Sequence, residues 1–443
     1  MTANGRMRIE DVQDGRDGLA RTVRIIIDGI TIQTPNYCVP MARSWQFDDL
    51  ELRLRIQGQT KGHIGSYIIR GFDYETVLQP RVRAIDQGTI EGEGFQSPIF
   101  RDFFGSNIYF YDPSAESLEY NRYLRRLTTS RRTPPQAREL GYELDKFTEG
   151  GMGRRLRVEK VWNFWGAMMN DKRNLARMEG HTLDYGSQTG ANVVLPFTLV
   201  IKSPGAYRIS KEVNRYWKEM CETAGKPSVH YLLMNRSVFR DDALVDEMCE
   251  DIERIETDIA VLKVKNADFT IPKDLQPREA YGRLLAAYSR LREKRGTKTA
   301  TAALDSGDQI FLNAAKSFDI VGRSSNGFDE EREASGGANP PAYGSALELD
   351  AMIPLPFAKW EERFLQIGQM PCDHDYCRQN LPTLDRNELP MDDWNVHRRP
   401  HNMLVMAEWM KQIEDAIVSG NARLIPQKLF NSQLKILGDI VPN

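Results

Sequence analysis

Residues 229–304 decide the fold. They contain three short apolar runs, VHYLLM (residues 229–234), IAVLKV (residues 259–264) and TATAAL (residues 299–304), which are separated by two stretches with apolar residues at helical spacing, DALVDEMCEDIERIETD and YGRLLAAYSRLREKR. A short apolar run favours a buried strand, and apolar residues three and four positions apart favour an amphipathic helix. Strands that alternate with helices predict a parallel sheet built from βα units.

Similar apolar runs occur on both sides of this stretch, from Ile108–Tyr111 to Phe318–Val321. A pattern of this kind over roughly 300 residues fits a (β/α)8 barrel better than two separate open sheets. We therefore predict an α/β fold with a TIM barrel over residues 21–360. We expect a flexible N-terminus at residues 1–20 and a zinc-binding C-terminal subdomain at residues 361–443.

The composition is that of an ordinary globular protein. The chain has 443 residues, of which 41% are hydrophobic and 27% are charged, and this excludes a disordered or collagen-like chain. No run approaches the roughly 18 apolar residues of a membrane span, and no apolar secretory segment is visible near the N-terminus. We expect no membrane partner and a cytoplasmic location. Five cysteines are too few for a disulfide scaffold.

Basic residues are concentrated in one segment. Residues 121–178 contain fourteen Lys and Arg against six Asp and Glu, so this segment carries +8 although the whole chain carries −3. Arginines bind phosphates, and the aromatic residues nearby offer surfaces for base stacking. The alternative is a solvated helical face whose aromatic residues lie in the core. We predict a basic helical insertion at residues 113–180 that binds nucleic acid through Arg125, Arg126, Arg131, Arg132, Arg154 and Arg155.

A second segment outside the barrel pattern is GRSSNGFDEEREASGGANPPAYGS, at residues 322–345. It follows the strand-like residues 318–321, and loops that follow barrel strands lie on the catalytic face. This loop is therefore a candidate lid in which Arg323 contacts phosphate. A disordered, solvated linker is the alternative.

The most specific motif lies near the C-terminus. Cys372, His374, Cys377 and His401 form the pattern C-x-H-x2-C-x23-H. Two thiolates and two imidazoles suit tetrahedral Zn²⁺, and four protein ligands leave no position for water. We predict one structural zinc per chain, which docks the C-terminal segment onto the main body. His397 is an alternative fourth ligand, and unligated surface residues are the alternative to a metal site.

A helix is expected to begin close to the last of these ligands. Its apolar residues recur at helical spacing and form a stripe that we expect to be buried against the barrel. The residues of this stripe are Met403, Met406, Met410, Ile413 and Ile417.

At the zinc motif the chain resembles the tRNA-guanine transglycosylase superfamily. These enzymes are zinc-stapled (β/α)8 barrels that exchange a guanine in nucleic acid for a 7-deazaguanine. The family's zinc signature is C-x-C-x2-C followed by a His-Asn pair, and the chain matches it with His374 in place of the second Cys. The resemblance covers most of residues 22–425 at low identity.

Two further segments carry the resemblance. Phe318-Asp319-Ile320-Val321 looks like the family's Phe-Asp-x-Val strand, whose Asp is the nucleophile. Thr34-Pro35 through Val39-Pro40-Met41 is similar to the family's N-terminal strand T-P-x-F-M-P-V. The resemblance thus implies that Asp319 is the catalytic nucleophile.

Other positions depart from the family's pattern. The second active-site Asp, in the family's D-S-G-G-F-Q, has its nearest candidate in Asp112. The base-binding Asp falls at Thr198, and Asn235 stands for the Gln of V-Q-G-G, where it either binds a purine edge or caps a loop. The G-G-L motif falls near residues 260–262, with both glycines lost. This divergence implies a rebuilt base pocket and favours the branch of the family that acts on DNA.

The resemblance implies a base exchange in two displacements. Asp319 attacks C1′ and expels guanine, and an incoming 7-deazaguanine such as 7-cyano-7-deazaguanine then displaces the covalent sugar ester. Asp112 is the expected acid–base partner. DNA is the favoured substrate, tRNA is the alternative, and a catalytically silent nucleic-acid-binding subunit is the third hypothesis. The family often pairs subunits, so a homodimer is among the expected assemblies.

Overall fold

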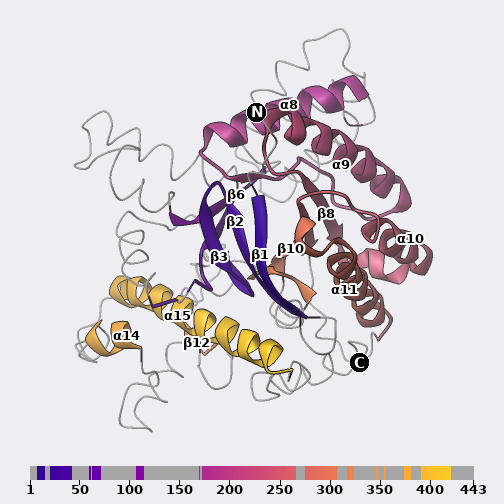
Figure 1. The fold of residues 1–443 in the computed structure, drawn as a ribbon. Helices are drawn as coiled ribbons and strands as arrows, with labels where there is room; N and C mark the ends of the chain where they lie inside the picture. Colours follow the sequence, from indigo (N-terminus) through magenta and orange to yellow (C-terminus); the bar gives the residue numbers. More distant parts are fainter. Residues whose placement is uncertain are drawn as a thin grey trace, which may run out of the picture.

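A computed structural model of the chain shows an α/β fold built around a parallel barrel (Figure 1). It describes residues 7–14, 20–41, 59–60, 62–70, 106–113, 169, 172–265, 275–306, 317–323, 346–347, 354–355, 374–380 and 391–420. At the ends of several of these segments only the backbone is described.

Eight parallel strands follow one another around the barrel in chain order. They are β4 (Asn36–Met41), β5 (Ser66–Arg70), β6 (Ile108–Asp112), β7 (Val193–Val194), β8 (Val229–Asn235), β9 (Ile259–Lys265), β10 (Ala300–Ser306) and β11 (Ile320–Arg323). The last strand, β11, pairs with the first, β4. A single bridge from Ile201 to Met234 joins the extended segment after β7 to β8, so the barrel is nearly closed. The predicted α/β barrel is confirmed at this level.

In the part of the chain that the structure describes, four helices lie between consecutive barrel strands, along one side of the barrel in Figure 1. They are α8 (Lys172–Gln188), α9 (Pro204–Ala224), α10 (Asp242–Ile252) and α11 (Leu275–Arg295). Local sequence sets their ends: the Ser203 hydroxyl accepts a hydrogen bond from the Ala206 N–H at the start of α9, and Gly225 ends the helix with a φ of 61°. Of the predicted insertion at residues 113–180, the structure describes residues 113, 169 and 172–180, and the last of these stretches belongs to α8.

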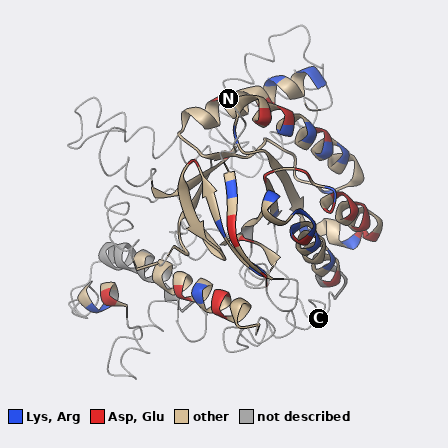
Figure 2. Cartoon of the chain, viewed as in Figure 1, with Lys and Arg blue, Asp and Glu red and all other residues tan. Residues whose placement is uncertain are grey.

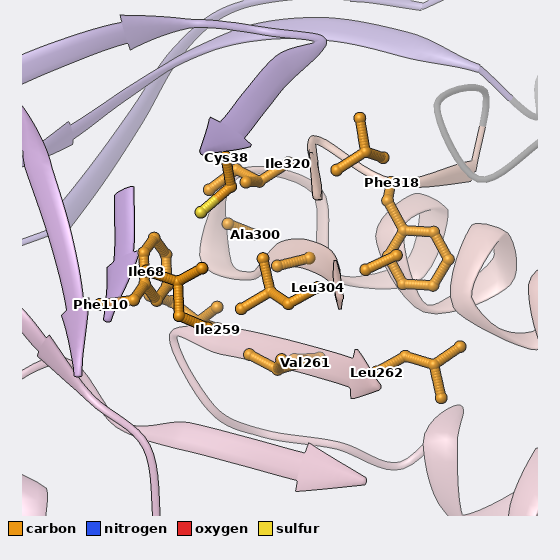
Figure 3. Packing of buried hydrophobic residues seen from close by; sticks show 14 of the residues in the cluster. Cys38, Ile68, Phe110, Ile259, Val261, Leu262, Ala300, Leu304, Phe318 and Ile320 are labelled. Atoms are coloured by element: carbon orange, nitrogen blue, oxygen red, sulfur yellow. The ribbon is translucent and has the colours of Figure 1, made fainter. Parts of the chain in front are cut away.

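Helix α8 packs closely against the strands. A Cβ at Gly186 would lie 2.5 Å from Val194 Cγ1 and 2.9 Å from Tyr111 Cδ1. Side chains on the inner faces of the strands fill the barrel, as Figure 3 shows for Cys38, Ile68 and Phe110. The interior of the barrel is therefore a packed core, and a functional site on the barrel would lie at one of its ends.

A three-stranded antiparallel sheet precedes the barrel. It consists of β1 (Met7–Asp14), β2 (Arg21–Ile27) and β3 (Ile30–Gln33). The turn at Asp28 and Gly29 has φ values of 50° and 84°, which suits the predicted two-residue hairpin. The expectation of a flexible segment at residues 1–20 is wrong for β1, which pairs with β2 at residues 7–10 and 13–14. Only Ile9 is fully buried in this polar strand, so its sequence carries little strand signal.

The C-terminal part contributes two helices, α14 (Asp375–Asn380) and α15 (Met391–Val418), and a short strand pair, β12 (Ala346–Leu347) and β13 (Pro354–Leu355). Helix α15 packs on β1, β2 and β4. The apolar stripe predicted for this helix is buried. Each of its five residues is at most 1% exposed: Met403, Met406, Met410, Ile413 and Ile417. In the part of the chain that the structure describes, no helix is long and apolar enough to cross a membrane.

Candidate functional site

A buried ion pair lies at the C-terminal end of the barrel strands. Asp112 is the last residue of β6, and Lys263 lies in β9. Lys263 Nζ donates a hydrogen bond to Asp112 Oδ2 at 2.7 Å. The side chain of Lys263 is 5% exposed and that of Asp112 is 10% exposed. TIM-barrel active sites lie at this end of the barrel, and we call these two residues the mouth pair.

Strand geometry explains why two residues 151 positions apart meet. Side chains alternate between the two faces of a strand. Phe110 and Val261 face the barrel interior (Figure 3). Asp112 and Lys263 each follow two positions later on the same strands, so they point inward from opposite walls. The barrel thus brings one carboxylate and one ammonium together above its apolar core.

Charge at this position is unusual for the molecule. Figure 2 shows Lys, Arg, Asp and Glu mainly along the helices, whereas most of the strand surface is uncharged. Each buried ion loses several kcal/mol of hydration, which the mutual attraction of a pair roughly repays. The mouth pair therefore adds little to the stability of the fold. Ionisable groups at this position of a barrel are candidate functional residues.

The two residues predicted to bind the base lie at or after strands β7 and β8, which come between the strands of Asp112 and Lys263 in the chain. Asn235 ends β8, and its Oδ1 accepts a hydrogen bond from the Ser237 N–H at 2.9 Å. This is the capping role that the sequence left as one of two alternatives. Thr198 lies in the extended segment after β7 and is 3% exposed. Its hydroxyl has no hydrogen-bond partner among the described residues.

Asp319 does not lie near Asp112. It precedes β11, and its backbone bonds to Thr301 near the start of β10 and to Asn36 at the start of β4. These contacts belong to the N-terminal end of the barrel. Ile320 lies beside Cys38 in the interior (Figure 3), so the neighbouring Asp319 side chain points out of the barrel. The prediction that Asp319 ends a strand at the catalytic face is therefore corrected.

The Asp319 carboxylate is fully buried and bound on both oxygens. Arg21 donates from Nε to Oδ1 at 2.9 Å and from Nη2 to Oδ2 at 2.8 Å. Thr301 donates from its backbone N–H to Oδ2 at 2.8 Å, and Arg292 Nη1 lies 3.5 Å from Oδ1. We call Asp319, Arg21, Arg292 and Thr301 the Asp319 cluster. Both oxygens of this carboxylate are already bound by neighbouring residues, so the geometry of the described residues does not support the predicted nucleophile role.

The remaining predicted site residues lie largely outside the described part of the chain. This holds for Cys372 and for the six arginines of the basic segment. Arg323 ends β11, His374 precedes α14, Cys377 lies in α14 and His401 lies in α15, but only His374 has a described side chain. Helix α14 contacts α15, so the two segments that carry the predicted zinc ligands are adjacent. Among the described side chains no group of three or more metal-binding residues is found.

Lys263 is the site residue that the sequence analysis missed. The run IAVLKV was interpreted as a buried strand, and the single lysine within it received no role. A lone lysine at an inward position of an apolar strand is the signal that pointed to it, because an unpaired ammonium is rarely buried.

The fold and the mouth pair together define an α/β barrel with an ionisable pair at the C-terminal ends of its strands. Comparison with known proteins adds no family: no protein-family model matches the chain, and no curated protein matches it.

Proposed function

We propose that the chain is a base-exchange transglycosylase that replaces a guanine in DNA with a 7-deazaguanine. The observation that carries the proposal is the mouth pair. It supplies a carboxylate at the end of the third barrel strand, from the residue that the resemblance gives as the nearest candidate for an active-site Asp. Zinc binding and nucleic-acid binding enter as parts of the same proposal.

The positions of the motifs support the resemblance. The segment with Val39 and Pro40 forms the first barrel strand, Asp112 ends the third, Thr198 follows the fourth and Asn235 ends the fifth. Each of these residues was matched to a family motif, and each lies in, at the end of or just after a barrel strand. Four such positions are a stronger argument than any one of these short motifs taken alone.

In this proposal Asp112, and not Asp319, forms the sugar ester. An Asp112 oxygen attacks C1′, the C1′–N9 bond breaks and guanine leaves. N9 of the incoming 7-deazaguanine then attacks C1′ and displaces Asp112. Two displacements restore the original configuration at C1′. The target nucleotide has to leave the base stack, at a cost of a few kcal/mol, before it meets a group at the mouth.

The basic segment supports a nucleic-acid substrate, since its arginines supply phosphate contacts close in sequence to Asp112. The donor set at the C-terminus suits zinc, because two thiols and two imidazoles match tetrahedral coordination. Cys372, His374, Cys377 and His401 would hold the ion, which would supply folding energy and no chemistry.

The proposal is tested by incubating the protein with a radiolabelled 7-deazaguanine and either duplex DNA or tRNA. We expect label in DNA and, on a denaturing gel, a covalent protein–DNA adduct. Label in tRNA alone would overturn the choice of DNA and retain the chemistry. Absence of label and adduct with both nucleic acids would overturn the enzymatic function.

A second candidate is a catalytically silent nucleic-acid-binding subunit. The specific observation in its favour is the Asp319 cluster, in which the family-like Asp is bound by two arginines. This candidate predicts binding of DNA or tRNA in a gel-shift assay with no exchange by the chain alone.

A further inference from the structure

We infer that Lys263 is the proton donor and proton acceptor of the base exchange. In this role it protonates the departing base and later removes the N9 proton of the incoming base. The inference rests on the proposed function and deepens it. It begins from the distance of 2.7 Å between Lys263 Nζ and Asp112 Oδ2.

The mouth offers an ammonium where a second carboxylate was expected. Asp112 was predicted to act with another acid, but its recorded hydrogen bond among the described residues is to Lys263. The two side chains are only 10% and 5% exposed, so separated charges are costly there. A proton-transfer partner that preserves neutrality is therefore favoured over a second negative charge.

The charges of the mouth pair balance at each step. At the start Asp112 carries −1 and Lys263 carries +1. When the Asp112 oxygen bonds to C1′ and the C1′–N9 bond breaks, the electron pair passes to guanine, and Lys263 gives the guanine a proton. The site then holds a neutral ester, a neutral amine and neutral guanine.

The second displacement reverses these changes. Neutral Lys263 takes the N9 proton of the incoming base, N9 attacks C1′, and the electron pair of the C1′–O bond returns to Asp112. Formation of the ester also removes the charge that held the ammonium, so the flexible lysine stem is released to follow the base. The original ion pair is restored when the product leaves.

The test compares two leaving groups in single-turnover base release. Duplex DNA carries either guanine or 7-methylguanine at the labelled position. 7-Methylguanine already bears a positive charge in DNA and departs without a proton. We expect Lys263→Met to slow release of guanine by about 10²- to 10⁴-fold, the usual contribution of a general acid. Release of 7-methylguanine should stay within about tenfold of the wild-type rate.

Lys263→Arg is the matched variant, because it keeps the positive charge beside Asp112 but does not give up a proton at neutral pH. We expect it to show the same selective loss on guanine. Circular dichroism checks that both variants fold, and Lys263→Arg alone carries the comparison if Lys263→Met does not fold.

An equal loss on both substrates would overturn the inference, since it would show that Lys263 only shapes the site. Wild-type rates for Lys263→Arg on guanine would overturn it as well. If the wild-type protein releases neither base, the proposed function fails and the inference fails with it. That result differs from a failure of Lys263 alone, in which the wild-type protein is active.

Discussion

Each end of the barrel holds a buried carboxylate bonded to a cation, and the two sites differ in how fully the carboxylate is bound. Asp112, at the C-terminal end, bonds to the single ammonium of Lys263. Asp319, at the N-terminal end, accepts hydrogen bonds from Arg21 and Thr301 and lies beside Arg292. Among the described residues, the Asp319 carboxylate is bound on both oxygens, whereas the Asp112 carboxylate is bonded to Lys263 alone. Asp112 is therefore the carboxylate to which the proposed function gives an exchange of partner.

The electrostatics of Asp319 follow from this saturation. Burial alone raises the pKa of its carboxyl group, but the charges of Arg21 and Arg292 and the hydrogen bonds from Arg21 and Thr301 outweigh burial and lower the pKa below its usual value. Arg21 also bonds to the carbonyl oxygens of Gly296 and Thr299, so the cluster ties the N-terminal sheet to the turn before β10. The same contacts that keep Asp319 ionised also hold it in place.

The largest expected effect is that of Asp112→Asn on activity. Loss of a nucleophile should lower the rate of base exchange on the order of 10⁴-fold or more, about 5 kcal/mol in the barrier, with no covalent adduct on a denaturing gel. The Asn oxygen can still accept from Lys263, so the variant should fold. Base exchange by the variant at a tenth of the wild-type rate or faster would show that Asp112 is not the nucleophile. The proposed difference between Asp112 and Asp319 would then be wrong.

Asp319→Ala should act on stability instead. It leaves Arg21 and Arg292, which are 5% and 3% exposed, without their counterion. Removing one partner of a buried pair costs about 3–5 kcal/mol in the free energy of unfolding, which urea denaturation measures.

The control for this variant is Asp246→Ala. Asp246 bonds to Arg283 at 2.7 Å but is 62% exposed, so its loss should cost less than about 1 kcal/mol. If Asp319→Ala has wild-type stability and still loses base exchange, Asp319 takes part in the chemistry and the two ends of the barrel exchange roles.

Much of the barrel could be predicted from the sequence because its central strands are apolar and alternate with helices. The runs at residues 229–234 and 259–264 lie within β8 and β9. The mostly apolar residues 193–200 form a strand only at Val193 and Val194, since Pro196 cannot donate to a strand ladder. Strands with weak apolar patterns, such as β1, become apparent only through their pairing.

The site was less predictable, because function depends on the face of the strand to which a residue points. The resemblance suggested Asp112 as the nearest candidate for a second active-site Asp, and Asp112 lies at the end of β6, at the mouth of the barrel. The motif Phe318-Asp319-Ile320-Val321 did not reveal that Ile320 points inward and Asp319 outward (Figure 3). Lys263 was missed because its partner Asp112 lies 151 positions away, so the lone lysine in an apolar run does not identify the pair by itself.

Loss of the predicted zinc should affect stability and leave the chemistry of the mouth pair unchanged. We expect elemental analysis to find about one zinc per chain, and Cys372→Ala to lose it. Zinc at one hundred times its Kd stabilises the folded state by about 2.7 kcal/mol, so the melting temperature should fall in the variant. Cys221→Ala, which changes a cysteine buried on α9, is the control that should retain zinc. A wild-type chain without zinc would contradict the C-terminal metal site.

The smallest effect is expected where α15 docks near the N-terminal end of the barrel. Glu414 accepts hydrogen bonds from Gln33 at 2.8 Å and from Lys411 at 2.6 Å, and its Oε2 lies 3.3 Å from His63 Nε2. Burial raises the pKa of Glu414, but the hydrogen bonds and charges of His63 and Lys411 outweigh burial and lower this pKa from 4.5 to about 2. The ionised carboxylate thus fastens the helix to the segments around β3 and β5.

Glu414→Gln should therefore destabilise the protein in a pH-dependent way. A carboxyl group with a lowered pKa contributes its full stabilisation above pH 4.5 and loses it as the pH falls through about 2. We expect the variant to be less stable than the wild type by about 1–2 kcal/mol at pH 7, and the difference to shrink between pH 4.5 and pH 3. Urea denaturation at several pH values measures this difference.

Asp415→Asn separates the docking contact from a general loss of negative charge on α15. Asp415 bonds to the same lysine, Lys411, at 2.9 Å, but it is 62% exposed, so water and salt screen the interaction. Its loss should change the free energy of unfolding by less than about 1 kcal/mol. If the difference between wild type and Glu414→Gln stays constant from pH 7 to pH 3, ionised Glu414 does not fasten the helix, and the apolar stripe of α15 alone holds it against the barrel.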